Sequence, residues 1–372
     1  MTKRRVIRYI DLFAGAGGLS QGFRQASDAR VEYRSVYAVE MEPSFAASYA
    51  ANFGDHVFAR PVERVRREDL PLADLIIGGP PCQGFSPLGK MSPTKHHADM
   101  NELWRHYFRI LGWVRPAAFV VENVPEFLAS DEFPSVERAA RRLGYRISRG
   151  VLNAADFGVP QLRRRGFVVG VLDGEPRLPM GDRRANGSTV RDAIGRLVRS
   201  PLVYDFENGT GSAHPARDLH IGRNPTKQSL VRYRCVPPGG NRFDLMRRRP
   251  DLTPRCWLEK KSGSTDVFGR LEWDKPALTI RTEFFKPEKG RYLHPELHRP
   301  ITHWEAARLQ SFPDDYLFCG SKIEIARQIG NAVPPKLAEA VARELTRTLL
   351  GEPPALPHPP LSHAEQLVLL ND

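Results

Sequence analysis

RYIDLFAGAGGLSQGFRQA, residues 8–26, is the stretch of the chain that decides its fold. An apolar run over residues 8–13 is followed by a glycine-rich turn and then by a helical pattern from Leu19 to Ala26. Glycines let a ligand approach the backbone, and the free N–H groups at the start of a helix can bind it. The order strand, glycine turn, helix therefore predicts a βαβ unit with a ligand at the turn. A plain tight turn without a ligand is the alternative.

The same alternation of strand and helix continues over about the first 175 residues. Further strands are expected at residues 35–39, 75–77, 117–121 and 167–171, and further helices at 43–52, 103–114 and 133–143. Strands that alternate with helices indicate βαβ units. The predicted fold class is therefore α/β, with a doubly wound, mostly parallel sheet.

The character of the sequence changes after this part. Residues 174–299 are rich in Pro, Gly, Arg and isolated aromatics, without a sustained helical period, which predicts a second, smaller, loop- and strand-rich domain. Helical patterns return at residues 302–310 and 335–350. We place the first domain at 1–178 plus 322–352, the second at 179–321, and a poorly ordered Pro-rich tail at 353–372.

Composition narrows the partners of this chain. Its 55 Lys and Arg against 43 Asp and Glu give a net charge of +12, which favours nucleic acid as a partner. A generally arginine-rich composition is the alternative. No apolar run approaches the roughly 18 residues of a membrane helix, and the basic amino-terminal segment does not resemble a signal peptide. Four scattered cysteines without metal-ligand spacing predict a reduced, cytoplasmic protein without structural zinc.

A second stretch, ADLIIGGPPCQGFS at residues 73–86, presents a lone thiol, that of Cys82. It reads as a buried strand that stops abruptly, and its two prolines leave little conformational freedom around the sulfur. Ligands of open α/β sheets lie beyond the carboxyl ends of the strands, so Cys82 is a candidate nucleophile. From this segment alone, a buried structural cysteine is an equally weighted alternative.

Charged residues near other strand ends complete a candidate site. Glu40 lies about 25 residues after the glycine turn, where an acidic residue can bind ribose hydroxyls. Ser20 replaces the third glycine of the dinucleotide pattern, which favours another adenosyl cofactor over NAD. Glu122, Arg163 and Arg165 flank further strands, and we expect them on the same side of the sheet as Cys82. For each of these motifs taken alone, a solvated surface charge is the simpler interpretation.

With these residues the chain closely resembles the DNA cytosine-5 methyltransferases. The matching segments, in the order typical of that family, are residues 11–18, Glu40, 78–86, 122–124, 161–165, 299–313 and 328–335. The resemblance implies a methyltransferase fold that binds S-adenosyl-L-methionine and a second domain, near residues 179–298, that recognises the target sequence. It also implies methyl transfer to C5 of a cytosine that is flipped out of duplex DNA, since the ring is inaccessible in a stacked helix.

The resemblance assigns the catalytic roles. Cys82 adds to C6 of cytosine, Glu122 holds a proton or hydrogen bond at N3, Arg165 contacts the O2 edge, and Arg163 orients the site. The base that removes the C5 hydrogen is not identified. On the cofactor side, Phe13 stacks on adenine, and Asn331 and Ala332 close the pocket. The implied cofactor-binding residues are Phe13, Ala14, Gly15, Gly17, Gly18, Leu19, Glu40, Met41, Pro80, Asn331 and Ala332.

Two positions depart from the family pattern. Pro61 stands where an Asp usually contacts the adenine amino group, and Glu63 would replace that contact only if its loop shifts. Met41 stands where an aromatic residue is common. We still expect an active enzyme, because every catalytic position is present.

The expected DNA contacts come from two regions. Residues 85–101 resemble the family's mobile loop that closes over the flipped base, and the second domain has arginines among aromatics. For any single arginine, a phosphate contact or a solvated face is a better expectation than base reading. The residues predicted to contact DNA are Gln83, Ser86, Lys90, Arg232, Arg234 and Arg242.

The leading hypothesis is a bacterial restriction–modification or orphan modification enzyme. We expect it to act on DNA as a monomer, in the cytoplasm near the nucleoid, with any cognate restriction endonuclease acting separately. The alternatives are an RNA cytosine-5 methyltransferase and a non-catalytic DNA-binding module of the same fold. A nicotinamide-dependent oxidoreductase is a third alternative, weakened by Ser20.

Overall fold

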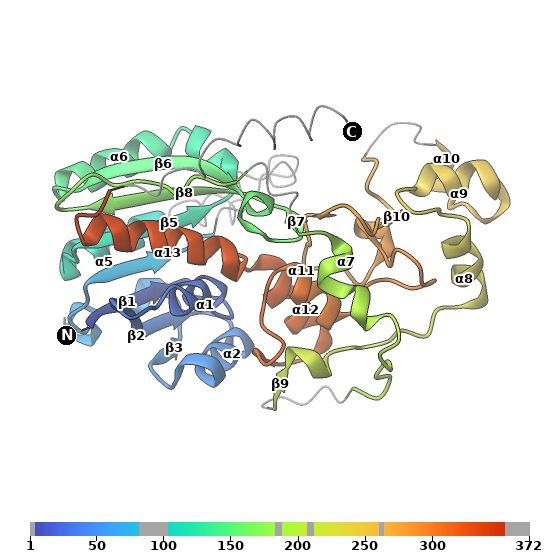
Figure 1. Cartoon of the computed structure of the whole chain (residues 1–372), viewed down its shortest axis with the longest axis horizontal. Helices are drawn as coiled ribbons and strands as arrows, with labels where there is room; N and C mark the ends of the chain where they lie inside the picture. Colours follow the sequence, from blue (N-terminus) through green and yellow to red (C-terminus); the bar gives the residue numbers. More distant parts are fainter. Residues whose placement is uncertain (1–3, 82–102, 183–187, 207–211, 260–263, 354–372) are drawn as a thin grey trace, which may run out of the picture.

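The computed structural model describes residues 4–81, 103–182, 188–206, 212–259 and 264–353. Seven strands of these residues form one sheet in the order β3-β2-β1-β4-β5-β8-β6 (Figure 1). Their bounds are β1 Arg5–Leu12, β2 Val31–Glu40, β3 Val57–Ala59, β4 Leu75–Gly78, β5 Ala118–Asn123, β6 Arg146–Asn153 and β8 Arg164–Val171. The pairs from β3 to β5 are parallel, whereas β8 runs antiparallel to β5 and β6. The structure confirms the predicted doubly wound, mostly parallel sheet.

Helices cover both faces of this sheet. They are α1 Gly18–Gln25, α2 Pro43–Phe53, α5 Trp104–Val114, α6 Phe133–Arg142 and α13 Pro335–Leu349. Apolar residues of α1 and α13 pack on one face, and those of α5 and α6 pack on the other. A Cβ added to Gly22 would lie 2.4 Å from the Cβ of Ala338, so α1 and α13 approach closely. The helix α13 therefore packs against the helix that follows the first glycine turn.

Two strands of the sheet escape the sequence pattern. The edge strand β6 has Arg146, Arg149 and Val151 exposed among partly buried residues, so it lacks the buried apolar run of a central strand. At the other edge, β3 has three residues, too few for a periodic signal. Edge strands pack on fewer neighbours, which relaxes the requirement for apolar side chains.

A second lobe follows the sheet (Figure 1). Its helices are α7 Val190–Ile194, α8 Lys227–Arg234, α9 Arg242–Arg248, α10 Arg255–Glu259, α11 His303–Leu309 and α12 Lys322–Asn331. Its short strands pair as β7 Gln161–Leu162 with β11 Ala277–Leu278, β9 Ala213–Pro215 with β13 Leu317–Cys319, and β10 Gly269–Arg270 with β12 Arg291–Leu293.

The sequence of this lobe predicts loops and strands, and this prediction is wrong for the residues that form α8, α9 and α10. These helices are short, so no long apolar period marks them. Side-chain caps start two of them, since Thr226 accepts a hydrogen bond from the Ser229 N–H and Asn241 accepts one from Phe243. The helix α12 is likewise absent from the prediction.

One apolar cluster joins the two parts of the molecule. It contains residues of α7, α11 and α12 together with Ala16 from the glycine turn. The predicted domain limit between residues 321 and 322 passes through this cluster, and the domain limits stay a prediction. Among the described helices, none combines the length and the apolar character needed to cross a bilayer.

Candidate active site

The ends of four strands meet at one edge of the sheet. Leu12 of β1 lies beside Gly78 of β4, and Gly78 lies beside Val121 of β5. Glu122 then pairs with Phe167 of β8. Because β8 is antiparallel, its amino-terminal start lies at the carboxyl edge of β5, and this orientation brings Arg165 to that edge. Arg165 thus reaches the expected edge from the start of its strand, not from a carboxyl end.

Glu122 and Arg165 form a buried ion pair at this edge. Arg165 Nε lies 3.0 Å from Glu122 Oε1, and the two side chains are 16% and 12% exposed. Burial raises the pKa of the Glu122 carboxyl, and the nearby Arg165 and Arg163 guanidinium groups only partly oppose this. A carboxyl with a raised pKa retains a proton more readily, so this group can donate a hydrogen bond to a ligand.

Gly79 leaves the space that this carboxyl occupies. A Cβ built on Gly79 would lie 2.9 Å from Glu122 Oε2, closer than side chains normally approach. The glycine is therefore required by the carboxylate next to it and not by an unusual backbone angle.

Asn123 fixes the segment that leads to the thiol. Its Nδ2 donates to the Pro80 carbonyl at 3.0 Å, and its Oδ1 accepts from the Val124 N–H at 2.8 Å. Pro80 is thereby held against the end of β5, next to Glu122. Cys82 follows two residues later, outside the described residues. Gln83, Ser86 and Lys90 also lie outside them.

Asn123 belongs to the segment 122–124 that resembles the family, and the resemblance implies no role for it. The sequence feature that could have identified Asn123 is a carboxamide next to the candidate acid, at the end of an apolar strand.

Arg163 joins the sheet to the second lobe. Its side chain is almost fully buried, and it donates to the carbonyls of Ile280 at 3.0 Å and Gly330 at 2.9 Å. Its charge acts on Glu122, while its guanidinium donates hydrogen bonds to the backbone of the second lobe. These contacts fit the orienting role that the resemblance implies for Arg163, and that role stays a prediction.

The glycine turn folds over the carboxylate of Glu40. Gly15 N donates to Glu40 Oε2 at 2.7 Å, and the backbone N of Glu42 donates to Oε1 at 2.9 Å. Phe13 and Gly15 have φ angles of 61° and 56°, in the left-handed region. A Cβ on Gly15 would meet no atom within 4 Å, so open space lies above the turn. A ligand can therefore approach the backbone at this point.

Other residues of the predicted cofactor site line or support the turn. A Cβ on Gly17 would collide with Phe53, and a Cβ on Gly18 would lie 3.1 Å from the Cβ of Ala332. The glycines at 17 and 18 thus permit close packing, whereas Gly15 faces open space. Leu19 buries its side chain under α13, and Ala14 donates its N–H to Val39. Met41 is 56% exposed, and Asn331 is exposed at the end of α12.

A buried polar network supports the turn from below. Ser20 Oγ donates to Asp11 Oδ2 at 2.6 Å and lies 2.9 Å from the Tyr49 hydroxyl. Burial raises the pKa of Asp11 to about 7. The sequence does not predict Asp11, Tyr49 or Ser20 as site residues. Ser20 enters the prediction only as the residue that replaces the third glycine of the dinucleotide pattern. The network explains that substitution, because the hydroxyl satisfies a buried carboxyl.

Most of the chain matches one family of proteins. Residues 7–347 match the family described as "C-5 cytosine-specific DNA methylase". This chain belongs to that family. It is 35% identical to the Type II methyltransferase M1.HphI of Haemophilus parahaemolyticus, over 93% of this chain and 88% of that protein. It is 31% identical to the Type II methyltransferase M.NgoFVII of Neisseria gonorrhoeae, over 91% and 86% of the two chains.

Solved structures agree with this assignment. A DNA modification methyltransferase encoded within a prophage (E. coli) superposes with a TM-score of 0.69 and 26% identity, covering 92% of this chain and 99% of that chain. The Dnmt2 methyltransferase of S. pombe shares the fold, with a TM-score of 0.60 and 18% identity over 92% and 99% of the two chains. The protein is thus a DNA cytosine-5 methyltransferase, and its family uses S-adenosylmethionine as the methyl donor.

One departure of this methyltransferase from its family lies near the expected adenine site. Pro61 immediately precedes a 3-10 turn, η1 Val62–Arg64, and Glu63 within that turn is exposed. Arg109 holds the turn by donating to the Val62 carbonyl at 3.1 Å. Glu63 thus lies exposed on a turn that Arg109 holds, and its contact to adenine stays a prediction.

The three predicted DNA-contacting arginines of the methyltransferase differ in position. Arg234 is exposed at the end of α8, while Arg232 uses its Nε to donate to the Leu252 carbonyl at 2.7 Å. Arg242 is 6% exposed, and its guanidinium lies 4.8 Å from the centre of the Phe243 ring. A side chain buried in this way is poorly placed to reach DNA, so Arg234 remains the best candidate of the three.

Proposed function

We propose that this methyltransferase methylates C5 of a cytosine in a specific duplex DNA sequence through a covalent bond from Cys82 to C6. The observation that carries the proposal is the Glu122–Arg165 pair, which lies at the same sheet edge as Pro80, two residues before Cys82. An acid and a cation side by side match the N3 and O2 atoms of a cytosine ring.

The chemistry divides among the residues as follows. The Cys82 thiolate forms a bond to C6, and the electron pair of the C5–C6 bond makes C5 nucleophilic. Glu122 donates a hydrogen bond at N3, and Arg165 stabilises the charge that develops at O2. When bound, S-adenosylmethionine supplies an electrophilic methyl group. After methyl transfer, a base removes the C5 proton and the bond between sulfur and C6 breaks, which restores the thiolate and the aromatic ring.

The turn above Glu40 fits the adenosyl part of this cofactor. Open space above Gly15 and the buried carboxylate of Glu40 suit a ribose, since a carboxylate accepts hydrogen bonds from its hydroxyls. Phe13 begins the turn and Met41 directly follows Glu40 at the end of β2, and both supply apolar surface for a base. We assign Pro80, Asn331 and Ala332 to the rest of this pocket.

The relatives suggest the biological setting. The two bacterial proteins named above carry the designation Type II, which points to a restriction–modification system for this chain. We propose that it acts as a monomer on duplex DNA in the bacterial cytoplasm, near the nucleoid, with any cognate endonuclease acting separately. Methylation of RNA is not favoured, because the family that the chain matches is named for DNA methylation.

Bisulfite sequencing of DNA from cells that express the protein tests this function and reveals its target sequence together. Methylcytosine is expected at one recurrent sequence, and none with Cys82→Ala. Duplexes of that sequence with 5-fluorocytosine at the target position should form a covalent adduct, because fluorine cannot leave as a proton does. Methylation of tRNA without methylation of DNA, or active enzyme that never forms the adduct, would contradict the proposal.

A further inference from the structure

Residues 161–165, QLRRR, form a strip with two unlike faces where the sheet meets the second lobe. Side chains alternate across an extended chain, so the strip presents Gln161, Arg163 and Arg165 on one face and Leu162 and Arg164 on the other. Each member of the first set is at least partly buried and is bonded to a protein group, as in the pair of Arg165 with Glu122. The inner face of the strip therefore holds the protein together.

The outer face of the strip is open. Leu162 is 43% exposed, although its side chain is apolar. Arg164 is exposed as well, and its side chain has no hydrogen bond, ion pair or ring contact within the described part of the chain. A guanidinium has several N–H donors in a rigid fork. Arg164 therefore presents a positive charge and unused donors directly beside Arg165.

The register of the sheet places Arg164 next to the candidate active site. Arg164 is the first residue of β8, and β8 pairs with β5 from Gly166 onward, which lies opposite Asn123. Arg164 thus extends beyond the end of β5. Residues two apart on a strand share a face with the residue opposite, so Arg164 is on the face of Asn123, whose carboxamide holds the Pro80 carbonyl. On this side of the sheet edge the chain continues to Cys82.

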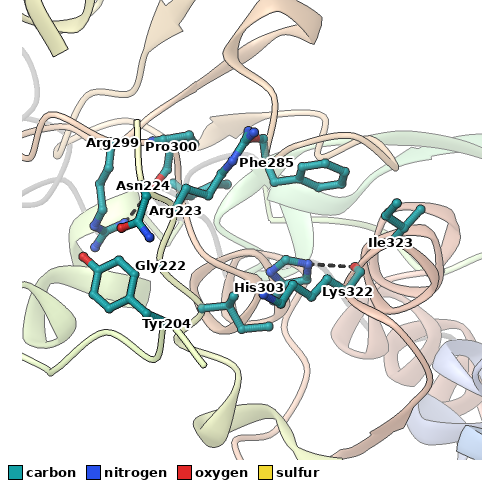
Figure 2. Close-up of a pocket in the computed structure, with 12 residues that line it drawn as sticks. Tyr204, Gly222, Arg223, Asn224, Phe285, Arg299, Pro300, His303, Lys322 and Ile323 are labelled. Atoms are coloured by element: carbon teal, nitrogen blue, oxygen red, sulfur yellow. Dashed lines mark hydrogen bonds between the residues drawn. The ribbon is translucent and has the colours of Figure 1, made fainter. Parts of the chain in front are cut away.

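Two cations that line a pocket of the second lobe are, by contrast, already engaged. This pocket has a volume of about 390 Å³ and is shown in Figure 2. Its Arg299 is bound to the buried carboxylate of Glu305 by two hydrogen bonds of 2.7 Å, and its Arg223 donates to the Phe285 carbonyl. Arg164 has no such partner within the described residues, so an anionic group of the substrate is better received at the strip.

We propose that Arg164 binds a backbone phosphate next to the flipped cytosine, and that Leu162 packs against the adjoining deoxyribose. The inference rests on the proposed methylation of duplex DNA, in which the target nucleotide turns out of the helix toward this edge of the sheet. Arginine binds phosphate through charge-assisted hydrogen bonds, and the apolar side chain beside it suits a sugar. Phosphate contacts position a protein on DNA. Arg164 thus positions the substrate without touching the reacting ring.

The test is a salt titration of DNA binding by the full-length protein, measured by fluorescence anisotropy with S-adenosylhomocysteine present. The probe is a duplex with the target sequence that bisulfite sequencing reveals. Arg164→Gln should raise the Kd about tenfold and lower the slope of log Kd against log salt by about 1, because one phosphate contact is lost. Arg164→Lys keeps the charge and should keep the slope. Leu162→Ala should raise the Kd without changing the slope, since it removes no charge.

Neutral phosphates locate the contact. A methylphosphonate in place of either phosphate next to the target cytosine removes one negative charge. One of these two substitutions should weaken binding by the wild type about tenfold and have no effect on Arg164→Gln, since both changes remove the same contact. Arg141→Gln is the matched control, because Arg141 is an exposed arginine near the end of α6, which leads to the opposite edge of the sheet. It should keep the wild-type Kd and slope.

Thermal unfolding establishes that each variant is folded, and the exposure of Arg164 allows its substitution. The inference is overturned if folded Arg164→Gln protein keeps either the wild-type Kd or the wild-type salt slope, or if it responds to the methylphosphonates as the wild type does. In those cases the wild type still methylates cytosine and forms the adduct with 5-fluorocytosine. A wild type that does neither refutes the proposed function instead, and this inference with it.

Discussion

Replacing Gly79 by alanine should impair catalysis through a single contact. Gly79 carries no reactive group, and its φ angle lies outside the left-handed region, so the backbone there can accommodate alanine. Its Cβ would lie 2.9 Å from Glu122 Oε2, whereas ordinary contacts begin at 3.4 Å. The carboxylate must therefore move by about 0.5 Å, and its other oxygen is held 3.0 Å from Arg165 Nε.

The size of the effect follows from this displacement. A misplacement of 1 Å at a catalytic group can cost about 10²-fold, so 0.5 Å corresponds to about tenfold in kcat. Stability should change little, because alanine restricts the unfolded chain and offsets about 0.4–1 kcal/mol of strain. The KM for S-adenosylmethionine should stay the same, since the proposed adenosyl site lies at the turn above Glu40.

The assay is steady-state methyl transfer to unmethylated DNA, together with thermal unfolding of each variant. Gly112→Ala, within α5, is the matched control. Its added Cβ would lie 3.5 Å from the Leu143 side chain, which is an ordinary contact distance. That control should keep its kcat and gain roughly 0.5–1 kcal/mol of stability, as alanine favours a helix. The reasoning fails if Gly79→Ala retains the wild-type kcat, or if Gly112→Ala loses as much activity.

Four further predictions concern the same molecule. Cys82→Ala should abolish methyl transfer but leave binding of DNA in mobility-shift assays, and substantial turnover by it would refute the nucleophile. Activity of the wild type should fall as pH rises through the raised pKa of Glu122, whereas the residual activity of Glu122→Gln, lower by about 10²-fold or more, should lack this limb of the pH–rate profile. DNA affinity should fall steeply with salt, in keeping with the charge of +12, and a flat response would contradict a phosphate-based interface. Burial lowers the pKa of His303 to about 4. Between about pH 6.5 and pH 4 this histidine is therefore protonated in the unfolded chain and neutral in the folded chain. The free energy of unfolding should fall by about 3 kcal/mol as the pH is lowered through that window. Denaturant titrations of His303→Phe should show a shallower dependence of this free energy on pH.

Some residues of the candidate site can be predicted from the local sequence, whereas the roles of others depend on contacts with distant segments. Glu122 and Cys82 are evident from the chain because Glu122 ends an apolar run and Cys82 lies shortly after another, and strand ends at one edge of a parallel sheet must converge. The role of Asn123 is visible only in the structure, where its carboxamide reaches the Pro80 carbonyl 43 residues earlier. Arg163 is similar, since its partners Ile280 and Gly330 lie 117 and 167 residues away.

The sequence by itself determined the fold class and the family of this protein, and it located the five inner strands of the sheet along the chain. These follow from short apolar runs, glycine turns and motif spacing, all of which are local properties. The tertiary structure decided the edge strands β3 and β6, the short helices α8 to α10, the burial of Arg242 and the pocket beside Arg223. In those places the burial of a residue depends on segments far along the chain, and no local period records which side chain a distant segment will cover.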